Sequence, residues 1–287
     1  MLYIIALIGF LLAAGIALGQ ALLYAFRWYE ISNRVYDPRV TWSKSLSWKR
    51  WRPLRSFVNE CFYTALYNVI IVWGGLINLF KKNVNHIDPD NFARDKPVII
   101  LIHGYMGQPM HFWLIRLRLK LKKTPNVVTF GYKLAGSEME PYRQRLREFV
   151  LHLQAETSVA KIIFIGHSFG GILAHDYARE YEDADEVRGI ITLGAPFRGS
   201  RLASMALTPL ARSLHPSGPM LGKIIGSRLN APLISIYSRY DQIVLPYTNA
   251  EHPFADENIE VDTCGHSGYF FNRKVFGILF EKLSSFS

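Results

Sequence analysis

The sequence is poor in cysteine, and Cys61 and Cys264 are its only two thiols among 287 residues. Two thiols at such distant positions provide no disulfide framework, and they say little about the redox compartment. Neither stands at a metal-ligand spacing, and the chain has no internal repeat, low-complexity tract or glycine-rich phosphate loop. The sequence therefore argues against a disulfide scaffold, a thiolate metal site, a repeat array and a phosphate-loop enzyme.

Charge is missing from the amino-terminal segment, where residues 2–26 contain no Asp, Glu, Lys or Arg. As a helix with a rise of about 1.5 Å per residue, this segment would be about 37 Å long, enough to cross a bilayer core. We interpret it as a transmembrane anchor. The alternative is a cleaved signal peptide, because Ala17-Leu18-Gly19 resembles a small-residue cleavage site. Against that alternative, no Lys or Arg precedes the apolar run.

A second apolar segment, residues 61–80, also lacks charge and is closed by Lys81-Lys82. Polar residues and glycines lower the hydrophobicity of this segment. It could therefore span the membrane or lie in the interface. The sequence thus divides into a membrane-anchoring region, 1–82, and a second domain, 83–287. The first region comprises the helix at 2–26, a basic loop at 27–60 and the apolar segment at 61–80.

Most of the net charge of +10 belongs to the amino-terminal region. Residues 1–82 hold ten Lys or Arg against three Asp or Glu, which leaves 23 against 20 for the rest. The basic loop also contains several Trp and Tyr, a mixture typical of segments at an anionic headgroup layer. Because the loop adjoins a membrane span and matches no nucleic-acid-binding module, we expect a membrane partner and no nucleic acid.

The positive-inside rule places the basic loop in the cytoplasm. If both apolar segments span, the second domain lies with the amino terminus on the opposite side, the periplasmic face of a bacterial inner membrane. We favour this hairpin, because a buried soluble helix seldom runs so long without a charge. If only the first segment spans, the second domain stays on the cytoplasmic face.

From residue 97 onward, short β-branched runs alternate with longer amphipathic segments. The runs are 98–102, 127–130, 162–165, 189–193, 233–237 and 259–261. Nearly continuous apolar strands separated by helices predict an α/β fold with a parallel sheet covered on both faces. In such sheets, functional groups collect at the carboxyl ends of the strands.

The pentapeptide Gly166-His167-Ser168-Phe169-Gly170 stands between the strand at 162–165 and a helix-like segment at 171–181. A serine on so sharp a turn adopts a strained backbone, and the flanking glycines let strand and helix pass closely. This context predicts an exposed nucleophile at Ser168. The glycine-rich turn His103-Gly104-Tyr105-Met106-Gly107 follows the first strand. This turn could bring a backbone N–H toward the serine, and Phe169 offers a second N–H, so that the two would stabilise an oxyanion; the alternative is an ordinary strand-to-helix turn.

A serine hydroxyl needs an imidazole base and a carboxylate that orients the imidazole. Asp241 directly follows the strand at 233–237, where the acid of such a fold belongs, and Asp262 is its one serious rival. His266 follows the last strand, whereas His252 precedes it. We therefore assign Asp241 as the acid and His266 as the base. We expect His167 and His175 to be packing or hydrogen-bonding residues.

These motifs together resemble an α/β-hydrolase of the bacterial lipase and GPI inositol-deacylase-like group. The resemblance covers residues 95–287 and includes Leu193-Gly194-Ala195-Pro196-Phe197-Arg198-Gly199-Ser200 and Gly265-His266-Ser267-Gly268. It implies an α/β-hydrolase fold and a Ser168, Asp241, His266 triad, with Tyr105 and Phe169 as oxyanion donors. It implies no metal and no cofactor.

The apolar, proline-broken segment 202–229 stands where lipases of this group carry a mobile lid. A plain pair of surface helices is the alternative, because lid motion leaves no mark in a sequence. The resulting hypothesis is a membrane-anchored serine carboxylester hydrolase, a lipase, phospholipase or esterase, acting on lipid esters. Two alternatives remain: an acyltransferase or thioesterase that uses the same acyl-enzyme, and a catalytically silent membrane scaffold. Head group, acyl length and oligomeric state are not legible.

Overall fold

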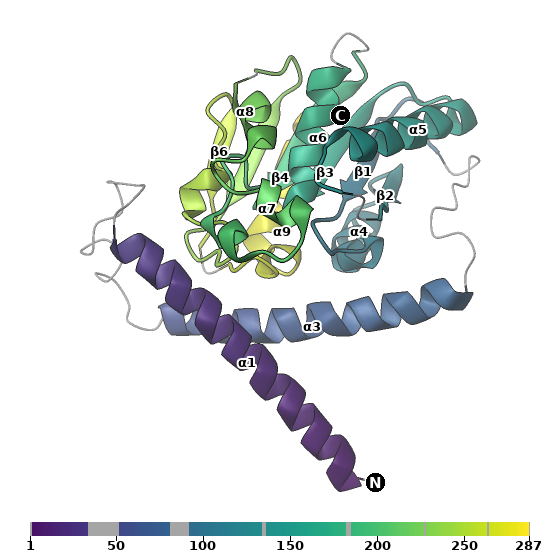
Figure 1. Cartoon of the computed structure of the whole chain (residues 1–287). Coiled ribbons are helices and arrows are strands. Elements are labelled where there is room, and N and C mark those ends of the chain that lie inside the picture. Colours follow the sequence, from purple (N-terminus) through teal and green to yellow (C-terminus); the bar gives the residue numbers. More distant parts are fainter. Residues whose placement is uncertain are drawn as a thin grey trace.

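The computed structural model of the protein describes residues 2–33, 52–80, 92–133, 136–181, 185–226, 228–262 and 264–286. Of the predicted basic loop, 27–60, residues 34–51 lie outside the described residues, as does the Lys81-Lys82 pair. The described ends of that loop are helical instead, because one helix continues to Ser32 and another begins at Arg52. The described residues form a domain around one sheet and two long amino-terminal helices (Figure 1).

The sheet has six strands, and every neighbouring pair is parallel. Their spatial order is β2-β1-β3-β4-β5-β6. The strands are β1 (Val98–Ile102), β2 (Val127–Phe130), β3 (Ile162–His167), β4 (Val187–Leu193), β5 (Leu233–Tyr237) and β6 (Glu257–Glu260). The sequence prediction of these strands and of their parallel arrangement is confirmed, with small differences at some strand ends.

Helices cover both faces of the sheet because successive strand residues point to opposite sides. Ile100 packs with the core of one face, and Ile99 and Leu101 pack with that of the other. The long helices α5 (Glu140–Thr157) and α6 (Phe169–Glu180) contribute to the first core, and α4 (Trp113–Leu121) and α9 (Arg273–Phe286) contribute to the second.

Short helices stand in the connections that follow the strands. They are η2 (Pro109–Phe112), η4 (Arg201–Met205), α7 (Pro209–Ser213), α8 (Pro219–Ile225), η5 (Tyr247–Ala250) and η6 (Gly268–Phe270). The segment predicted as a lid contains most of η4 and the whole of α7 and α8. Leu210 and Leu214 anchor it in the core, whereas Leu207 is 90% exposed.

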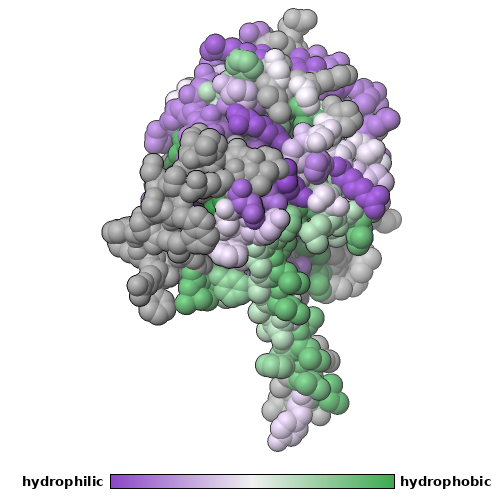
Figure 2. Space-filling model, turned by 60° about the vertical axis from the view of Figure 1, so that its left-hand side comes forward, coloured by the Kyte–Doolittle hydropathy of each residue, from purple (hydrophilic) through white to green (hydrophobic). Residues whose placement is uncertain are grey.

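The first amino-terminal helix, α1 (Leu2–Ser32), projects away from the domain, and the amino terminus lies at its far end (Figure 1). Its outer half is an apolar column beside a polar domain surface (Figure 2). Residues 9–32 are the one stretch among the described residues that is long and apolar enough to cross a membrane.

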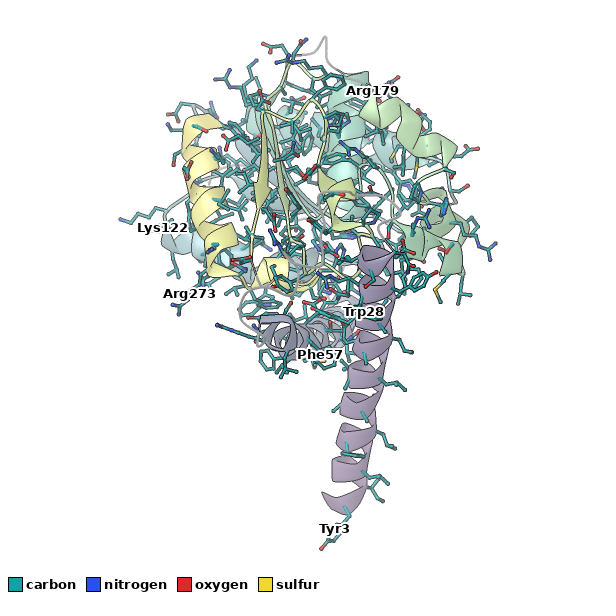
Figure 3. All side chains as sticks on the ribbon, turned by 90° about the vertical axis from the view of Figure 1, so that its left-hand side faces the viewer. Tyr3, Trp28, Phe57, Lys122, Arg179 and Arg273 are labelled. Atoms are coloured by element: carbon teal, nitrogen blue, oxygen red, sulfur yellow. The ribbon has the colours of Figure 1, made fainter. Side chains whose placement is uncertain are left out.

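The second amino-terminal helix, α3 (Arg52–Phe80), contains the apolar segment 61–80 and runs along the base of the domain (Figure 1). It crosses α1 close to Phe57 (Figure 3). The rings of Tyr24 and Phe57 meet edge to face with their centroids 5.5 Å apart. It also packs on the domain, because Tyr67 stacks on His111 with 3.5 Å between ring centroids. Both helices therefore contact the rest of the molecule.

Candidate active site

Ser168 stands on the turn between β3 and α6 in a strained conformation, with φ 54° and ψ −124°. Two glycines make the turn possible. A Cβ at Gly166 would lie 2.5 Å from the backbone of Gly171, and a Cβ at Gly170 would lie 2.3 Å from the carbonyl oxygen of Ile102. The predicted need for glycine on both sides of the serine is confirmed.

His266 and Asp241 meet at the carboxyl ends of the strands. Nδ1 of His266 lies 2.8 Å from Oδ2 of Asp241, and the Tyr269 hydroxyl donates to the same oxygen at 3.2 Å. The other carboxylate oxygen, Oδ1, accepts the N–H groups of Ile243 and Val244 at 2.8 and 2.9 Å. The four donors fix the carboxylate and leave the imidazole one orientation in which Nδ1 carries the proton.

The electrostatics of the pair make the imidazole of His266 more basic. Burial opposes the charged form of His266, but the charge and hydrogen bond of Asp241, with the charge of Glu60, raise the pKa of His266 above its usual value. An imidazole that sits beside a fixed carboxylate is a stronger base towards a hydroxyl proton. The arrangement therefore suits proton transfer.

The run from Gly194 to Ser200 shapes the site around the acid. Gly194 has φ 59°, and a Cβ there would lie 3.0 Å from Oδ2 of Asp241. The Ser200 hydroxyl donates to the carbonyl oxygen of Ile243 and accepts the N–H of Leu245 at 3.1 Å. This motif therefore leaves room for the carboxylate and ties down the loop that carries it.

A cavity of about 490 Å³ opens at this edge of the sheet, and its lining is mainly apolar. Ser168 and His266 both line it. The predicted lid segment contributes Leu202, Met205 and Leu214 to the wall. The helix α1 contributes Gln20, and α3 contributes Thr64, Tyr67 and Asn68. The sequence reasoning treated these two helices as an anchor only, and it missed their place in the wall.

The two predicted oxyanion donors lie at the expected turns. Phe169 is the first residue of α6, where backbone N–H groups have no acceptor within the helix and the helix dipole favours negative charge. Tyr105 lines the cavity and sits in a tight turn closed by a 2.9 Å bond from Gly107 N–H to Gly104 O. Its hydroxyl contacts Thr208 at 2.7 Å, so this turn touches the predicted lid segment.

The rival histidines have other partners. His252 contacts the carbonyl oxygen of Ile224 through Nε2 at 3.1 Å. Nε2 of His167 donates to the carbonyl oxygen of His266 at 3.0 Å, which supports the loop of the candidate base. Burial lowers the pKa of His175 to about 3 and that of His167 well below its usual value. Both stay uncharged inside the core.

Glu60 is a buried group near the site that sequence reasoning missed. Its carboxylate accepts the N–H groups of Ser267 and Gly268, at 2.7 and 3.2 Å, directly after His266. A signal was present in the sequence. Ser56, Glu60 and Thr64 recur at a spacing of four, which puts three polar side chains on one face of an otherwise apolar helix.

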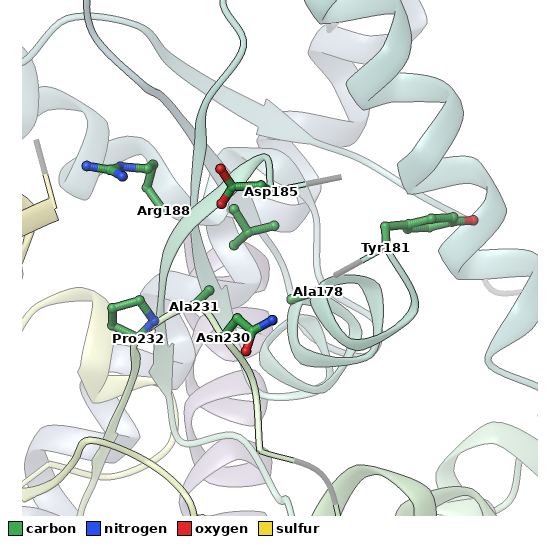
Figure 4. Close-up of a pocket in the computed structure, with 8 residues that line it drawn as sticks. Ala178, Tyr181, Asp185, Arg188, Asn230, Ala231 and Pro232 are labelled. Atoms are coloured by element: carbon green, nitrogen blue, oxygen red, sulfur yellow. The ribbon is translucent and has the colours of Figure 1, made fainter. Parts of the chain in front are cut away.

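A second, smaller hollow of about 130 Å³ lies at the amino ends of β4 and β5 (Figure 4). Its described lining includes Asp185, Arg188 and Asn230 but no serine, cysteine or histidine. Within the described part of the chain, no cluster of three or more His, Cys, Asp or Glu is arranged to hold a metal ion. We therefore place the candidate active site in the larger cavity.

Comparison with known proteins agrees with this architecture. A family model described as alpha/beta hydrolase fold matches residues 97–213. The solved structure of lipase B from Aspergillus fumigatus aligns with a TM-score of 0.59 at 18% identity. That alignment covers 68% of this chain and 55% of the lipase. The chain has the α/β-hydrolase fold.

Two further structures match this α/β-hydrolase fold over most of their own length. A Listeria innocua gene product aligns with a TM-score of 0.53 at 18% identity, covering 67% of this chain and 96% of its own. The mature lipase BlEst2 of Bacillus licheniformis aligns with a TM-score of 0.52 at 16% identity. That alignment covers 70% of this chain and 95% of the lipase. About a third of this chain is therefore outside each of these alignments.

Proposed function

We propose that the protein is a membrane-anchored serine carboxylester hydrolase that acts on lipid esters through Ser168, His266 and Asp241. One observation carries the proposal. A serine on a strained turn shares an apolar cavity with a histidine whose other ring nitrogen is held by a buried carboxylate. Such a constellation makes a nucleophile from a hydroxyl at neutral pH.

In the proposed reaction the Ser168 oxygen attacks the ester carbonyl while Nε2 of His266 takes its proton. Asp241 stabilises the imidazolium that forms, and the N–H groups of Tyr105 and Phe169 stabilise the oxyanion. The ester C–O bond then breaks, and the imidazolium returns the proton to the departing alcohol. Water, deprotonated by His266, attacks the acyl-enzyme and releases the carboxylic acid together with free Ser168.

The cavity wall supports a lipid as substrate. The proposed lid segment gives the cavity an apolar wall, and the amino-terminal helices add Tyr67 beside the polar Gln20, Thr64 and Asn68. Exposed Met106, Met205 and Leu207 extend the apolar surface at the carboxyl ends of the strands. Two of the proteins that share this fold are named as lipases. The finer resemblance to GPI inositol-deacylase-like proteins points to the same ester chemistry.

We infer that α1 alone spans the membrane. The inner face of α3 contacts the domain from Glu60 to Tyr67, and Ile70 is also buried. Only ten residues of the helix follow Ile70, which amounts to about 15 Å. The hydrocarbon core is about 30 Å thick, so this remainder is too short to cross it. The hairpin favoured from the sequence does not fit this contact.

The outer face of α3 fits the membrane interface. Val58, Phe62, Val69 and Val72 are 55%, 64%, 62% and 64% exposed, and they follow helical spacing along one stripe. A helix with one apolar exposed stripe lies in the interface plane. With a single span, the positive-inside rule leaves the domain on the cytoplasmic face.

Replacing Ser168 with alanine tests the enzymatic part of the proposal. The Ser168→Ala protein, purified in detergent, is expected to hydrolyse medium-chain p-nitrophenyl esters at the rate of the buffer alone, because the attacking oxygen is gone. The wild-type protein is expected to prefer micellar long-chain esters over short soluble ones. Full activity of Ser168→Ala would refute the assignment, and a preference for short soluble esters would refute the lipid substrate.

A further inference from the structure

The inner face of α3 carries a buried carboxylate in a helix that is otherwise suited to lipid. Ser56 and Glu60 are both fully buried. An ionised carboxylate removed from water is costly unless several donors surround it. A carboxylate at this position therefore needs hydrogen-bond donors from the rest of the molecule.

Three N–H groups serve as those donors. Oε1 of Glu60 accepts from Ser267 N–H at 2.7 Å and from Gln242 Nε2 at 3.0 Å, and Oε2 accepts from Gly268 N–H at 3.2 Å. The loop closes tightly around the carboxylate, since a Cβ at Gly265 would lie 2.3 Å from Oε2. All three partners are donors, a pattern that an ionised carboxylate satisfies.

Gln242 connects Glu60 to the chain around Asp241 and to the backbone of His266. It directly follows Asp241 in the chain, and its Oε1 accepts the backbone N–H of His266 at 3.1 Å. Its Nε2 donates to Glu60 and also to Oε1 of Gln20 on α1, at 3.1 Å. Through Gln242 and the loop after His266, Glu60 is joined to the neighbours of both the acid and the base.

We propose that Glu60 is a positioning residue for His266, so that the amino-terminal helices complete the active site rather than only anchor it. The inference rests on the proposed function. A misplacement of about 1 Å in such a loop can cost on the order of 100-fold in rate. The helices α1 and α3 therefore set the geometry of the base from the membrane side of the domain.

The charge of Glu60 has a second consequence. The titratable groups that face it and His266 include Asp241, His167, Tyr269, Cys264, Tyr24, Tyr63 and Cys61. Burial raises the pKa of the Glu60 carboxyl, and the hydrogen bonds from Gln242 and Ser267 oppose this rise. The charge of Glu60 contributes to the raised pKa of His266. Removing that charge therefore shifts the protonation of the base to lower pH.

Two variants of Glu60 separate the effect of its charge from the effect of its side-chain length. In Glu60→Gln the amide oxygen can keep the bonds from Ser267 and Gln242, but the NH₂ group then faces the N–H of Gly268. Glu60→Asp keeps the charge but is one methylene shorter. The matched control is Glu148→Gln, which removes an exposed carboxylate from α5.

The measurement is kcat/KM against pH for the full-length protein in detergent, with p-nitrophenyl ester hydrolysis as readout and rates expressed per folded molecule. Glu60→Gln is expected to lower the plateau about 10- to 100-fold. It is also expected to move the acid limb to lower pH, because His266 must be neutral to act and its pKa falls. Glu60→Asp is expected to lower the plateau without moving the limb, and Glu148→Gln to match the wild type.

A loss of less than tenfold in Glu60→Gln, or an unmoved acid limb, overturns the inference. If Glu60→Gln does not fold, Gly265→Ala replaces it, since the added methyl pushes the loop off the carboxylate. A wild-type rate in Gly265→Ala also overturns the inference. Absence of ester hydrolysis in the wild type would instead contradict the proposed function, so the two failures are distinguishable.

Discussion

The substitution Asp241→Asn is the sharpest test of the candidate triad, because the hydrogen bonds dictate how the amide must sit. Oδ1 accepts two backbone N–H groups, from Ile243 and Val244. These donors fix the amide oxygen at that position. The NH₂ group must then face Nδ1 of His266, which lies 2.8 Å from Oδ2 in the wild type.

An NH₂ donor at that place forces His266 into the opposite tautomer. Nδ1 becomes the acceptor and Nε2 carries the proton, so the imidazole cannot take the proton of Ser168. In a Ser-His-Asp triad the same change lowers kcat about 10⁴-fold, which corresponds to about 5.5 kcal/mol of transition-state stabilisation. We expect a loss of that order here, with little change in KM.

The assay is steady-state hydrolysis of a medium-chain p-nitrophenyl ester by detergent-purified protein, with circular dichroism to confirm folding. Asp262→Asn is the control, because it alters the rival acid. We expect Asp262→Asn to stay within about threefold of the wild type, since Asp241 is the carboxylate that lies 2.8 Å from Nδ1 of His266. A folded Asp241→Asn protein within tenfold of the wild type would refute the reasoning.

Two further predictions concern the turn and the membrane topology. Gly170→Ala is expected to destabilise the fold by about 3 kcal/mol or more, because its Cβ would lie 2.3 Å from the Ile102 carbonyl oxygen; a melting temperature equal to that of the wild type would contradict the geometry of the turn. Alkaline phosphatase fused to the carboxyl terminus is expected to be inactive in a bacterial host and green fluorescent protein fused there to fluoresce; an active phosphatase would reject the single-span topology.

The parallel sheet and the positions of its strands along the chain were predictable because the relevant signals are local, whereas the spatial order of the strands was not predicted. Runs such as Val98–Ile102 are buried on both faces and read as uninterrupted apolar strands. The turn around Ser168 was predictable for a related reason. Close backbone contacts require glycine at fixed positions before and after the serine. The position of Asp241 and His266 followed from their place after particular strands.

The part that α1 and α3 play in the site could not be predicted with the same rules. Apolar side chains on α3 favour a membrane span by composition, whether they face lipid or protein. The decisive contacts join residues about 200 positions apart, such as Glu60 and Ser267. Glu60 stands one residue before the charge-free segment, so it was counted with the basic loop. Tertiary packing, not local pattern, gives it a buried environment.

The most direct test of the account is to find which residue a fluorophosphonate probe modifies. Such a probe reacts with a serine that an adjacent base activates. The account predicts a single adduct on Ser168, located by peptide mass spectrometry, and its absence in Asp241→Asn and His266→Ala under the same conditions. No adduct on the folded wild-type protein, or an adduct on another residue, would contradict the central claim.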